Sequence, residues 1–203
     1  MKGVRTGYGL AYRIGFAPWE HYGRVAASTL GALLDREEAD RPHPPGRALD
    51  LGCGRGQKTH ELARRGWDVV GIDTASHAID VASRSAPSGA RFVVGDVTEL
   101  ESADLGAAFD FFLDVGCFQH LDADERAAMG RGVCALANPR ATLLMLEFGA
   151  TRLRSLTGGV TRAEIQAALP GWGLVAVEPA DTAGLGWPLT RTSPHWYRFR
   201  LAA

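Results

Sequence analysis

The sequence predicts an α/β protein in which a mostly parallel sheet is covered by helices. From Arg47 onward, short apolar runs alternate with helical patterns, as strands and helices alternate in parallel sheets. Prolines and a glycine at residues 42–46 separate this region from the preceding chain. The length of 203 residues suits one well-buried domain. We therefore expect a single domain with one active site.

The expected elements follow from apolar runs and helix-start signals. The expected helices lie between the strands. Two of these helices begin with a capping box, formed by Asp122 with Glu125 and by Thr161 with Glu164. The expected strands are residues 47–51, 68–72, 91–94, 109–114, 142–148, 174–177 and 195–201, and the expected helices are residues 57–65, 75–85, 122–137 and 162–169.

The first 45 residues precede the alternating pattern and are expected to form a helical cap. Val25, Leu30 and Leu34 recur at near-helical spacing, and residues 35–41 are charged, which predicts a solvated helix end. Aromatic residues crowd the segment before this helix. They predict either a lid over the site or a hydrophobic anchor that holds the helix to the sheet.

Composition and charge exclude several classes of protein. Lys and Arg number 22 against 23 Asp and Glu, and no basic block is present, which argues against a nucleic-acid partner. The chain shows no apolar stretch of about 18 residues and no signal segment, so we expect a cytoplasmic protein without a membrane partner. Cys53, Cys117 and Cys134 are far apart, and the histidines lack ligand spacing, so neither disulfides nor a metal site is expected.

A glycine-rich loop follows the first expected strand. The stretch from Ala48 to Gly56 reads ALDLGCGRG, with glycine at every second position of the loop. Such a loop lets the main chain approach a ligand, and the helix after it presents free N–H groups that suit a carboxylate. Asp73 follows the second strand, where an acidic side chain can accept hydrogen bonds from both ribose hydroxyls. These features predict a nucleoside ligand.

Two further carboxylates follow the next strands. Asp96 comes after the third strand, where it can bind the exocyclic amine of adenine while Val97 packs on the ring. Asp114 ends the fourth strand, beside the switch point at which such sheets bind ligands. The loop reads GxGxG, with Gln57 at the sixth position, rather than the GxGxxG of dinucleotide-binding proteins.

This set of motifs, in this order over residues 46–148, resembles the class I S-adenosylmethionine-dependent methyltransferases. The resemblance implies a Rossmann-like three-layer α/β/α sandwich with seven strands, the last of them antiparallel. It implies that Asp50 and the glycine loop hold the methionine end of the cofactor, Asp73 the ribose and Asp96 the adenine. The chain is also similar to small bacterial methyltransferases that act on heterocycles, phenols or thiols.

The resemblance and the patterns together predict the site. Residues 1–45 form a cap, residues 46–148 the cofactor-binding core and residues 149–203 the rest of the sheet and the acceptor pocket. The expected cofactor-binding residues are Trp19, Asp50, Gly52, Cys53, Gly54, Gly56, Asp73, Thr74, Asp96, Val97, Asp114, Val115 and Gly116. The expected acceptor-binding residues are Tyr12, Phe118 and Gln119.

Methyl transfer from a sulfonium is an in-line displacement, so the protein must mainly align the reactants and exclude water. His120, after the fourth strand, is the candidate base for an acceptor that carries a proton, with helix capping or packing as the alternative. The sequence does not specify whether O, N or S is methylated. An RNA or protein methyltransferase, a non-catalytic cofactor-binding module and a dehydrogenase remain as competing functions.

Overall fold

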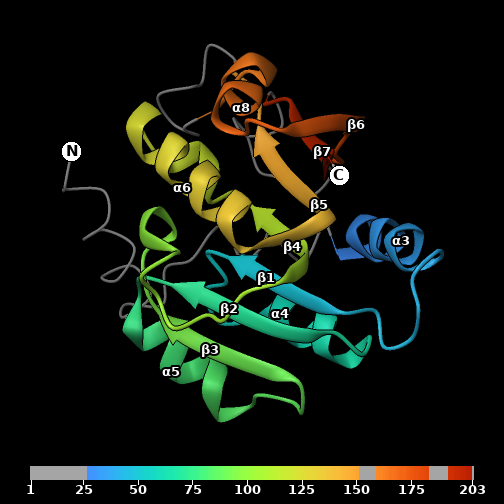
Figure 1. Cartoon of the computed structure of the whole chain (residues 1–203), viewed down its shortest axis with the longest axis vertical. Coiled ribbons are helices and arrows are strands. Elements are labelled where there is room, and N and C mark those ends of the chain that lie inside the picture. The colour runs from blue at the N-terminus through green and yellow to red at the C-terminus, as the bar shows by residue number, and fades with distance from the viewer. Residues whose placement is uncertain (1–26, 151–158, 183–191, 203) are drawn as a thin grey trace.

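The computed structural model describes residues 27–150, 159–182 and 192–202. A twisted sheet runs through the middle of the molecule and helices lie on both of its faces (Figure 1). The sheet has seven strands in the order β3-β2-β1-β4-β5-β7-β6. The strands are β1 (Arg47–Leu51), β2 (Asp68–Asp73), β3 (Ala90–Val94), β4 (Phe109–Val115), β5 (Ala137–Phe148), β6 (Trp172–Pro179) and β7 (Pro194–Leu201).

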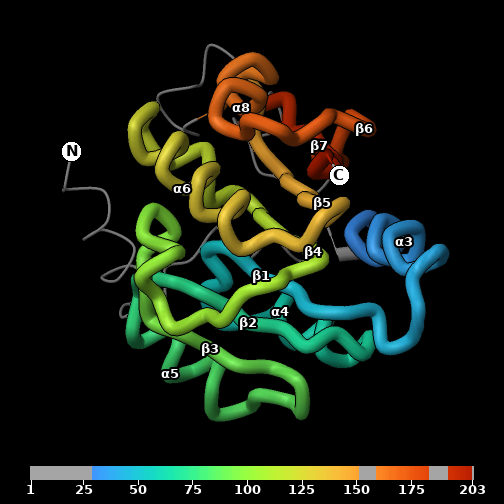
Figure 2. The backbone as a smooth tube through the Cα atoms, viewed as in Figure 1, coloured from blue at the N-terminus to red at the C-terminus, as the bar shows by residue number. Residues whose placement is uncertain are grey.

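The strand pairing confirms the predicted sheet. Strands β3, β2, β1, β4 and β5 pair in parallel, whereas β7 is antiparallel to both β5 and β6. The chain starts at β1 in the middle, moves out to β3, returns to β4 beside β1 and then moves out the other way (Figure 2). The reversal between β1 and β4 is the topological switch point, at whose carboxyl edge such sheets bind ligands.

Helices cover both faces of the sheet because its central strands are apolar on both sides. Phe112 of β4 packs in a core cluster with α6 (Ala123–Leu136) and α8 (Arg162–Ala168), whereas Phe111 and Leu113 pack in a second cluster with α3 (Ala27–Glu38) and α4 (Gln57–Arg64). Burial on both faces explains why these strands appear in the sequence as continuous apolar runs. The described ranges also contain the helix α5 (Ser76–Arg84) and the short 3-10 turns η1 (Val97–Glu99) and η2 (Phe118–His120).

Both predicted capping boxes are present. Asp122 accepts a hydrogen bond from the amide of Glu125 at 3.0 Å, and the Glu125 carboxylate accepts one from the amide of Asp122 at 2.9 Å. Thr161 and Glu164 make the same reciprocal pair at 3.2 and 2.7 Å. These bonds satisfy amide groups that the first turn of a helix leaves unpaired.

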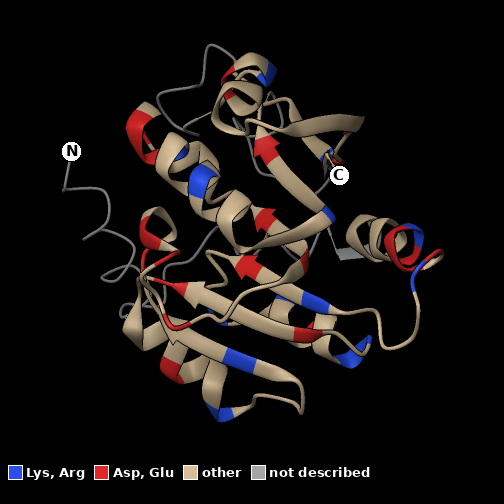
Figure 3. Ribbon diagram, in the orientation of Figure 1, with Lys and Arg blue, Asp and Glu red and all other residues tan. Residues whose placement is uncertain are grey.

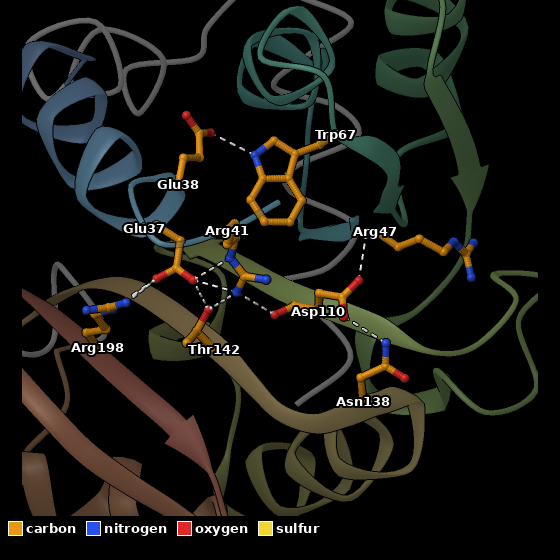
Figure 4. Close-up of polar contacts among 9 residues, drawn as sticks. All are labelled: Glu37, Glu38, Arg41, Arg47, Trp67, Asp110, Asn138, Thr142 and Arg198. Atoms are coloured by element: carbon orange, nitrogen blue, oxygen red, sulfur yellow. Dashed lines mark hydrogen bonds and ion pairs between the residues drawn. The ribbon is translucent and has the colours of Figure 1, made fainter. Parts of the chain in front are cut away.

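The prediction of a solvated helix end at residues 35–41 is wrong for Glu37. This side chain is 5% exposed and accepts hydrogen bonds from Arg41 and Arg198, each at 2.6 Å. Figure 4 shows the carboxylate between the two guanidinium groups. The charge is buried because two cations from α3's own end and from β7 compensate it, a tertiary arrangement that periodicity does not reveal.

The same network connects the amino-terminal edge of the sheet. Asp110, near the start of β4, accepts hydrogen bonds from the amide of Arg47 at 2.9 Å and from the side chain of Asn138 at 2.7 Å (Figure 4). The indole of Trp67 donates to Glu38 at 2.8 Å. Arg41, after the end of α3, also donates to the main-chain oxygen of Asp110 at 3.1 Å, so these contacts connect the end of α3 to the amino-terminal edge of the sheet, opposite the carboxyl edge.

Candidate active site

Acidic side chains gather at the carboxyl edge of the sheet. Figure 3 shows acidic positions at the arrowheads of neighbouring strands. Asp73 ends β2, and Asp50, Asp114 and Glu147 lie one residue before the ends of β1, β4 and β5. The parallel register places these strand ends next to one another, so the predicted cofactor residues of β1, β2 and β4 do share one edge.

The loop between β1 and α4 requires glycine at residues 52 and 56. Gly52 has φ of 71°, and a Cβ there would lie 2.8 Å from the Cβ of Cys117. Gly56 has φ of 77°, and a Cβ there would lie 2.6 Å from the ring of Phe92. Positive φ and close approach together exclude larger residues. The loop therefore lies closely against its neighbours and leads the main chain to the start of α4.

Asp73 is oriented by the loop. Its carboxylate accepts hydrogen bonds from the amide of Gly54 at 2.9 Å and from the amide of Ala75 at 2.8 Å. Burial raises the pKa of Asp73, and these two hydrogen bonds oppose that rise. A carboxylate can accept about four hydrogen bonds, so acceptor capacity remains for ribose hydroxyls. Thr74, the next residue, is exposed.

Asp96 begins the η1 turn. Its side chain accepts hydrogen bonds from the amide and the hydroxyl of Thr98, at 2.9 and 2.7 Å. Val97 is 5% exposed and belongs to the core cluster beneath α6. These contacts fix the position of Asp96 at the end of β3, while its predicted bond to adenine stays a prediction.

Asp50, near the end of β1, and Cys53, in the loop after it, both contact neighbouring elements. Asp50 is 1% exposed and accepts a hydrogen bond of 2.6 Å from the hydroxyl of Thr59, which connects β1 to α4. A Cβ at Gly71 would lie 2.9 Å from the sulfur of Cys53, so the absence of a side chain on β2 makes room for it. Burial raises the pKa of the Cys53 thiol, which keeps it protonated and fits the predicted space-filling role.

The turn after β4 is held by Asp114. The carboxylate accepts hydrogen bonds from the amides of Cys117 at 2.8 Å and Phe118 at 3.1 Å. Phe118 is fully buried in the core cluster beneath α6, and the guanidinium carbon of Arg126 lies 5.3 Å from the centroid of its ring. Phe118 thus occupies a core position, the alternative to its predicted acceptor contact. Gly116 has φ of 80°, and it and Val115 are partly exposed at the edge.

Gln119 orients the ring of His120. Its side-chain oxygen accepts a hydrogen bond of 2.7 Å from the amide of Phe148, so its NH2 group is the part that lies 3.3 Å from Nε2 of His120. Nε2 then accepts, which corresponds to a neutral imidazole protonated at Nδ1. His120 is an exposed residue, yet desolvation of the ring, followed by the charge of Arg126, lowers its pKa. A neutral imidazole is the form that a general base requires.

Sequence reasoning missed Glu147. It is 1% exposed at the end of β5, and its Oε2 accepts a hydrogen bond of 3.1 Å from the amide of Gln119. The sequence does contain a feature that points to Glu147, because it is an acidic residue in the apolar run from Ala141 to Phe148. A charge in a fully buried strand calls for a partner or a function.

Part of the chain is similar to known methyltransferases. Residues 48–140 match the family described as methyltransferase domain. A ubiquinone biosynthesis O-methyltransferase of Mesorhizobium japonicum is 38% identical over 94 residues, which are 45% of this chain and 38% of that protein. A magnesium-protoporphyrin O-methyltransferase of Rhodobacter capsulatus is 46% identical over 57 residues, 26% of this chain and 25% of that protein. The chain thus matches well under half the length of these curated relatives.

Solved structures share the fold over nearly the whole chain. The 1,6-didemethyltoxoflavin-N1-methyltransferase of Burkholderia thailandensis, solved with 1,6-didemethyltoxoflavin and S-adenosylhomocysteine, has a TM-score of 0.73 at 21% identity, covering 98% of this chain and 88% of that one. The N-methyltransferase NodS of Bradyrhizobium japonicum has a TM-score of 0.71 at 15% identity, covering 89% and 98%. Residues 48–140, just under half of the chain, are therefore similar to a methyltransferase domain, and the chain shares the Rossmann-like fold of these solved methyltransferases.

The predicted fold class is confirmed, and the match to the methyltransferase family agrees with the predicted cofactor. The roles of individual site residues stay predictions. Tyr12 and Trp19 lie outside the described residues, as do the loop residues 151–158 and 183–191. Among the described ranges, no cluster of three or more His, Cys, Asp or Glu suits a metal ion. No helix within those ranges is long and apolar enough to cross a membrane.

Proposed function

We propose that this protein transfers a methyl group from S-adenosylmethionine to a small molecule at the carboxyl edge of its sheet. The observation that carries the proposal is the contact between the glycine loop and Asp73, whose carboxylate the amide of Gly54 orients at 2.9 Å. This contact holds a carboxylate that could accept hydrogen bonds from a ribose, beside a loop in which Gly52 and Gly56 leave no room for a side chain. The family of the domain and the O-methyltransferase relatives support the reaction.

The described residues fit the cofactor along the strand order. The glycine loop and the start of α4 receive the methionine end, Asp73 the ribose and Asp96 the adenine. Asp50 connects β1 to the start of α4 through its hydrogen bond with Thr59, beside the place proposed for the methionine end. When bound, the cofactor supplies a methyl group on a positively charged sulfur with a neutral thioether as leaving group.

The acceptor is placed against the turn after β4. His120 is exposed there as a neutral imidazole, so for an acceptor that carries a proton we assign it the role of base. The side-chain amide of Gln119 contacts Nε2 of the His120 ring and orients it. Residues 1–45, with Tyr12 and Trp19, act as the cap, and residues 149–203 complete the single domain and the acceptor pocket. We propose that the protein acts in the cytoplasm. We also propose that it has no nucleic-acid partner, because its acidic and basic residues are nearly equal in number.

A methylation assay tests this function. The purified protein is incubated with isotopically labelled S-adenosylmethionine and a panel of phenols, heterocyclic nitrogens and thiols, and products are measured by mass spectrometry. Phenols come first because the matched relatives are O-methyltransferases. Label in a small molecule, strongly reduced with Asp73→Ala, is the expected result. Label transferred to RNA or protein instead would support the competing methyltransferase class, and tight binding without transfer would support a binding module.

A further inference from the structure

Two buried carboxyl groups lie side by side at the ends of β4 and β5. Asp114 is 0% and Glu147 1% exposed. Both point to the face of α6 and α8, because each lies two residues after a member of that core cluster, Phe112 on β4 and Met145 on β5. The register pairs Asp114 with Met145, which makes Glu147 its diagonal neighbour. The two carboxyl groups lie within hydrogen-bonding reach of each other.

The donors around the pair are unequal. Asp114 accepts hydrogen bonds from two amides, those of Cys117 and Phe118. Glu147 accepts one at Oε2 from the amide of Gln119, while its buried Oε1 has no partner within the described ranges. A proton on Oε1 that is donated to Asp114 satisfies this oxygen. Glu147 is therefore the protonated member, and Asp114 is the member that ionises.

The pair gains its negative charge near neutral pH. Burial raises the pKa of Asp114 to about 7, against the hydrogen bonds that lower it. Burial first, and the charge of Asp114 second, hold the pKa of Glu147 well above its usual value. The other charged or titratable groups that face the pair from its neighbours are Asp50 on β1, Cys117 in the turn, Arg126 on α6 and Tyr197 on β7.

The pair lies on the acceptor side of the glycine loop. Cys117, whose amide Asp114 holds, packs directly on Gly52, where a Cβ would lie 2.8 Å away. Asp73 ends β2 and Asp96 follows β3, and these two strands lie on the other side of β1 from β4. A nucleoside bound there directs the sulfur end of the cofactor toward β1 and β4. The ionisable pair thus lies on the side of the loop where the sulfur end of the cofactor, with the positive charge that methyl transfer removes, would lie.

We propose that Asp114 and Glu147 discriminate between the two forms of the cofactor, carrying more negative charge when the cationic methyl donor is bound than when the neutral product is bound. This inference rests on the proposed cofactor site. Opposite unit charges about 10 Å apart, at an effective dielectric constant of about 20, change an affinity by roughly tenfold. The charged pair thus favours the methyl donor over the product, and the discrimination is lost when the pair is fully protonated.

Calorimetric titration with S-adenosylmethionine and S-adenosylhomocysteine, between pH about 6 and about 8.5, tests the inference without an acceptor. In the wild type, preference for the methyl donor should rise about tenfold over this range. Asp114→Asn should abolish the rise. Glu147→Gln should keep it, because the amide NH2 donates to Asp114 as the protonated carboxyl does. The exposed Glu178, which pairs with Arg36, provides the control Glu178→Gln, which should behave as the wild type.

The amino group of the ligand titrates alike with every variant, so differences between variants isolate the pair. A rise that persists in Asp114→Asn, or is lost in Glu147→Gln, would overturn the assignment. If Asp114→Asn does not fold, infrared spectra of wild-type protein with labelled aspartate carboxyls decide: a protonated aspartate band must be stronger with the product than with the methyl donor. Identical spectra would contradict the inference. Failure of both ligands to bind would instead refute the cofactor site.

Discussion

The carboxylate of Asp73 accepts a hydrogen bond from the amide of Gly54 at 2.9 Å, which connects the end of β2 to the loop after β1. This contact joins the two sequence features that most clearly indicate a nucleoside. It also orients the carboxylate before any ligand binds, so binding costs little side-chain entropy.

Replacement of Asp73 should therefore weaken cofactor binding. Asp73→Ala should reduce the affinity for S-adenosylhomocysteine by about 1.5 to 3 kcal/mol, because two ribose hydroxyls lose a charged acceptor. Calorimetry measures the change. Asp68→Ala, an exposed position at the opposite end of the same strand, is the matched control. Equal affinities of Asp73→Ala and the wild type would remove Asp73 from the site.

His120 should affect transfer rather than binding. His120→Ala should slow methylation of a protonated acceptor by about a hundredfold, while S-adenosylhomocysteine affinity stays unchanged. Since its pKa is lowered, the wild-type rate should persist as pH falls below about 6.5 and decline only at lower pH. His43→Ala, at an exposed histidine before β1, serves as control. A rate within a factor of about three of the wild type would make His120 a packing residue.

The buried carboxyl pair should make stability depend on pH. Because folding raises the pKa values of Asp114 and Glu147, their contribution to stability is present at low pH and is lost as pH rises through about 7. Glu147→Gln removes the second ionisation. Between the usual pKa of a glutamate and the raised pKa of Glu147 in the folded protein, the wild type should lose about 1.4 kcal/mol of unfolding free energy per pH unit more than Glu147→Gln does. Denaturant unfolding at several pH values measures this, and parallel curves for both proteins would exclude the raised pKa.

Glu37 should contribute strongly to stability. Glu37→Ala leaves the guanidinium groups of Arg41 and Arg198 partly buried without their carboxylate, which should cost about 3 to 5 kcal/mol. The exposed ion pair of Arg36 with Glu178 gives a control in the same helix, where Arg36→Ala should cost less than about 1 kcal/mol. Thermal unfolding compares the two. Similar losses for both variants would show that the buried network adds no more than a surface pair.

Much of the fold could be predicted because local signals and global structure agree. The apolar runs predict all seven strands, although β5 begins at Ala137, earlier than expected, where the chain carries polar residues and a proline. The capping boxes of Asp122 and Thr161 were readable because their partners lie three residues away.

What the sequence could not predict depends on contacts between distant residues. Glu37 is bound by Arg198, 161 positions away, so its charged surroundings in the sequence suggested a solvated face. Glu147 meets Asp114 only because β4 and β5 are neighbours in this register. Phe118 follows a strand end, which suggested the acceptor pocket, yet the turn held by Asp114 directs it into the core.

The most direct test of the central claim is calorimetric titration of the purified protein with S-adenosylhomocysteine, with NAD as a control. The account predicts micromolar binding of S-adenosylhomocysteine alone, through the glycine loop and Asp73. Absence of binding at millimolar concentration, or binding of NAD instead, would contradict it.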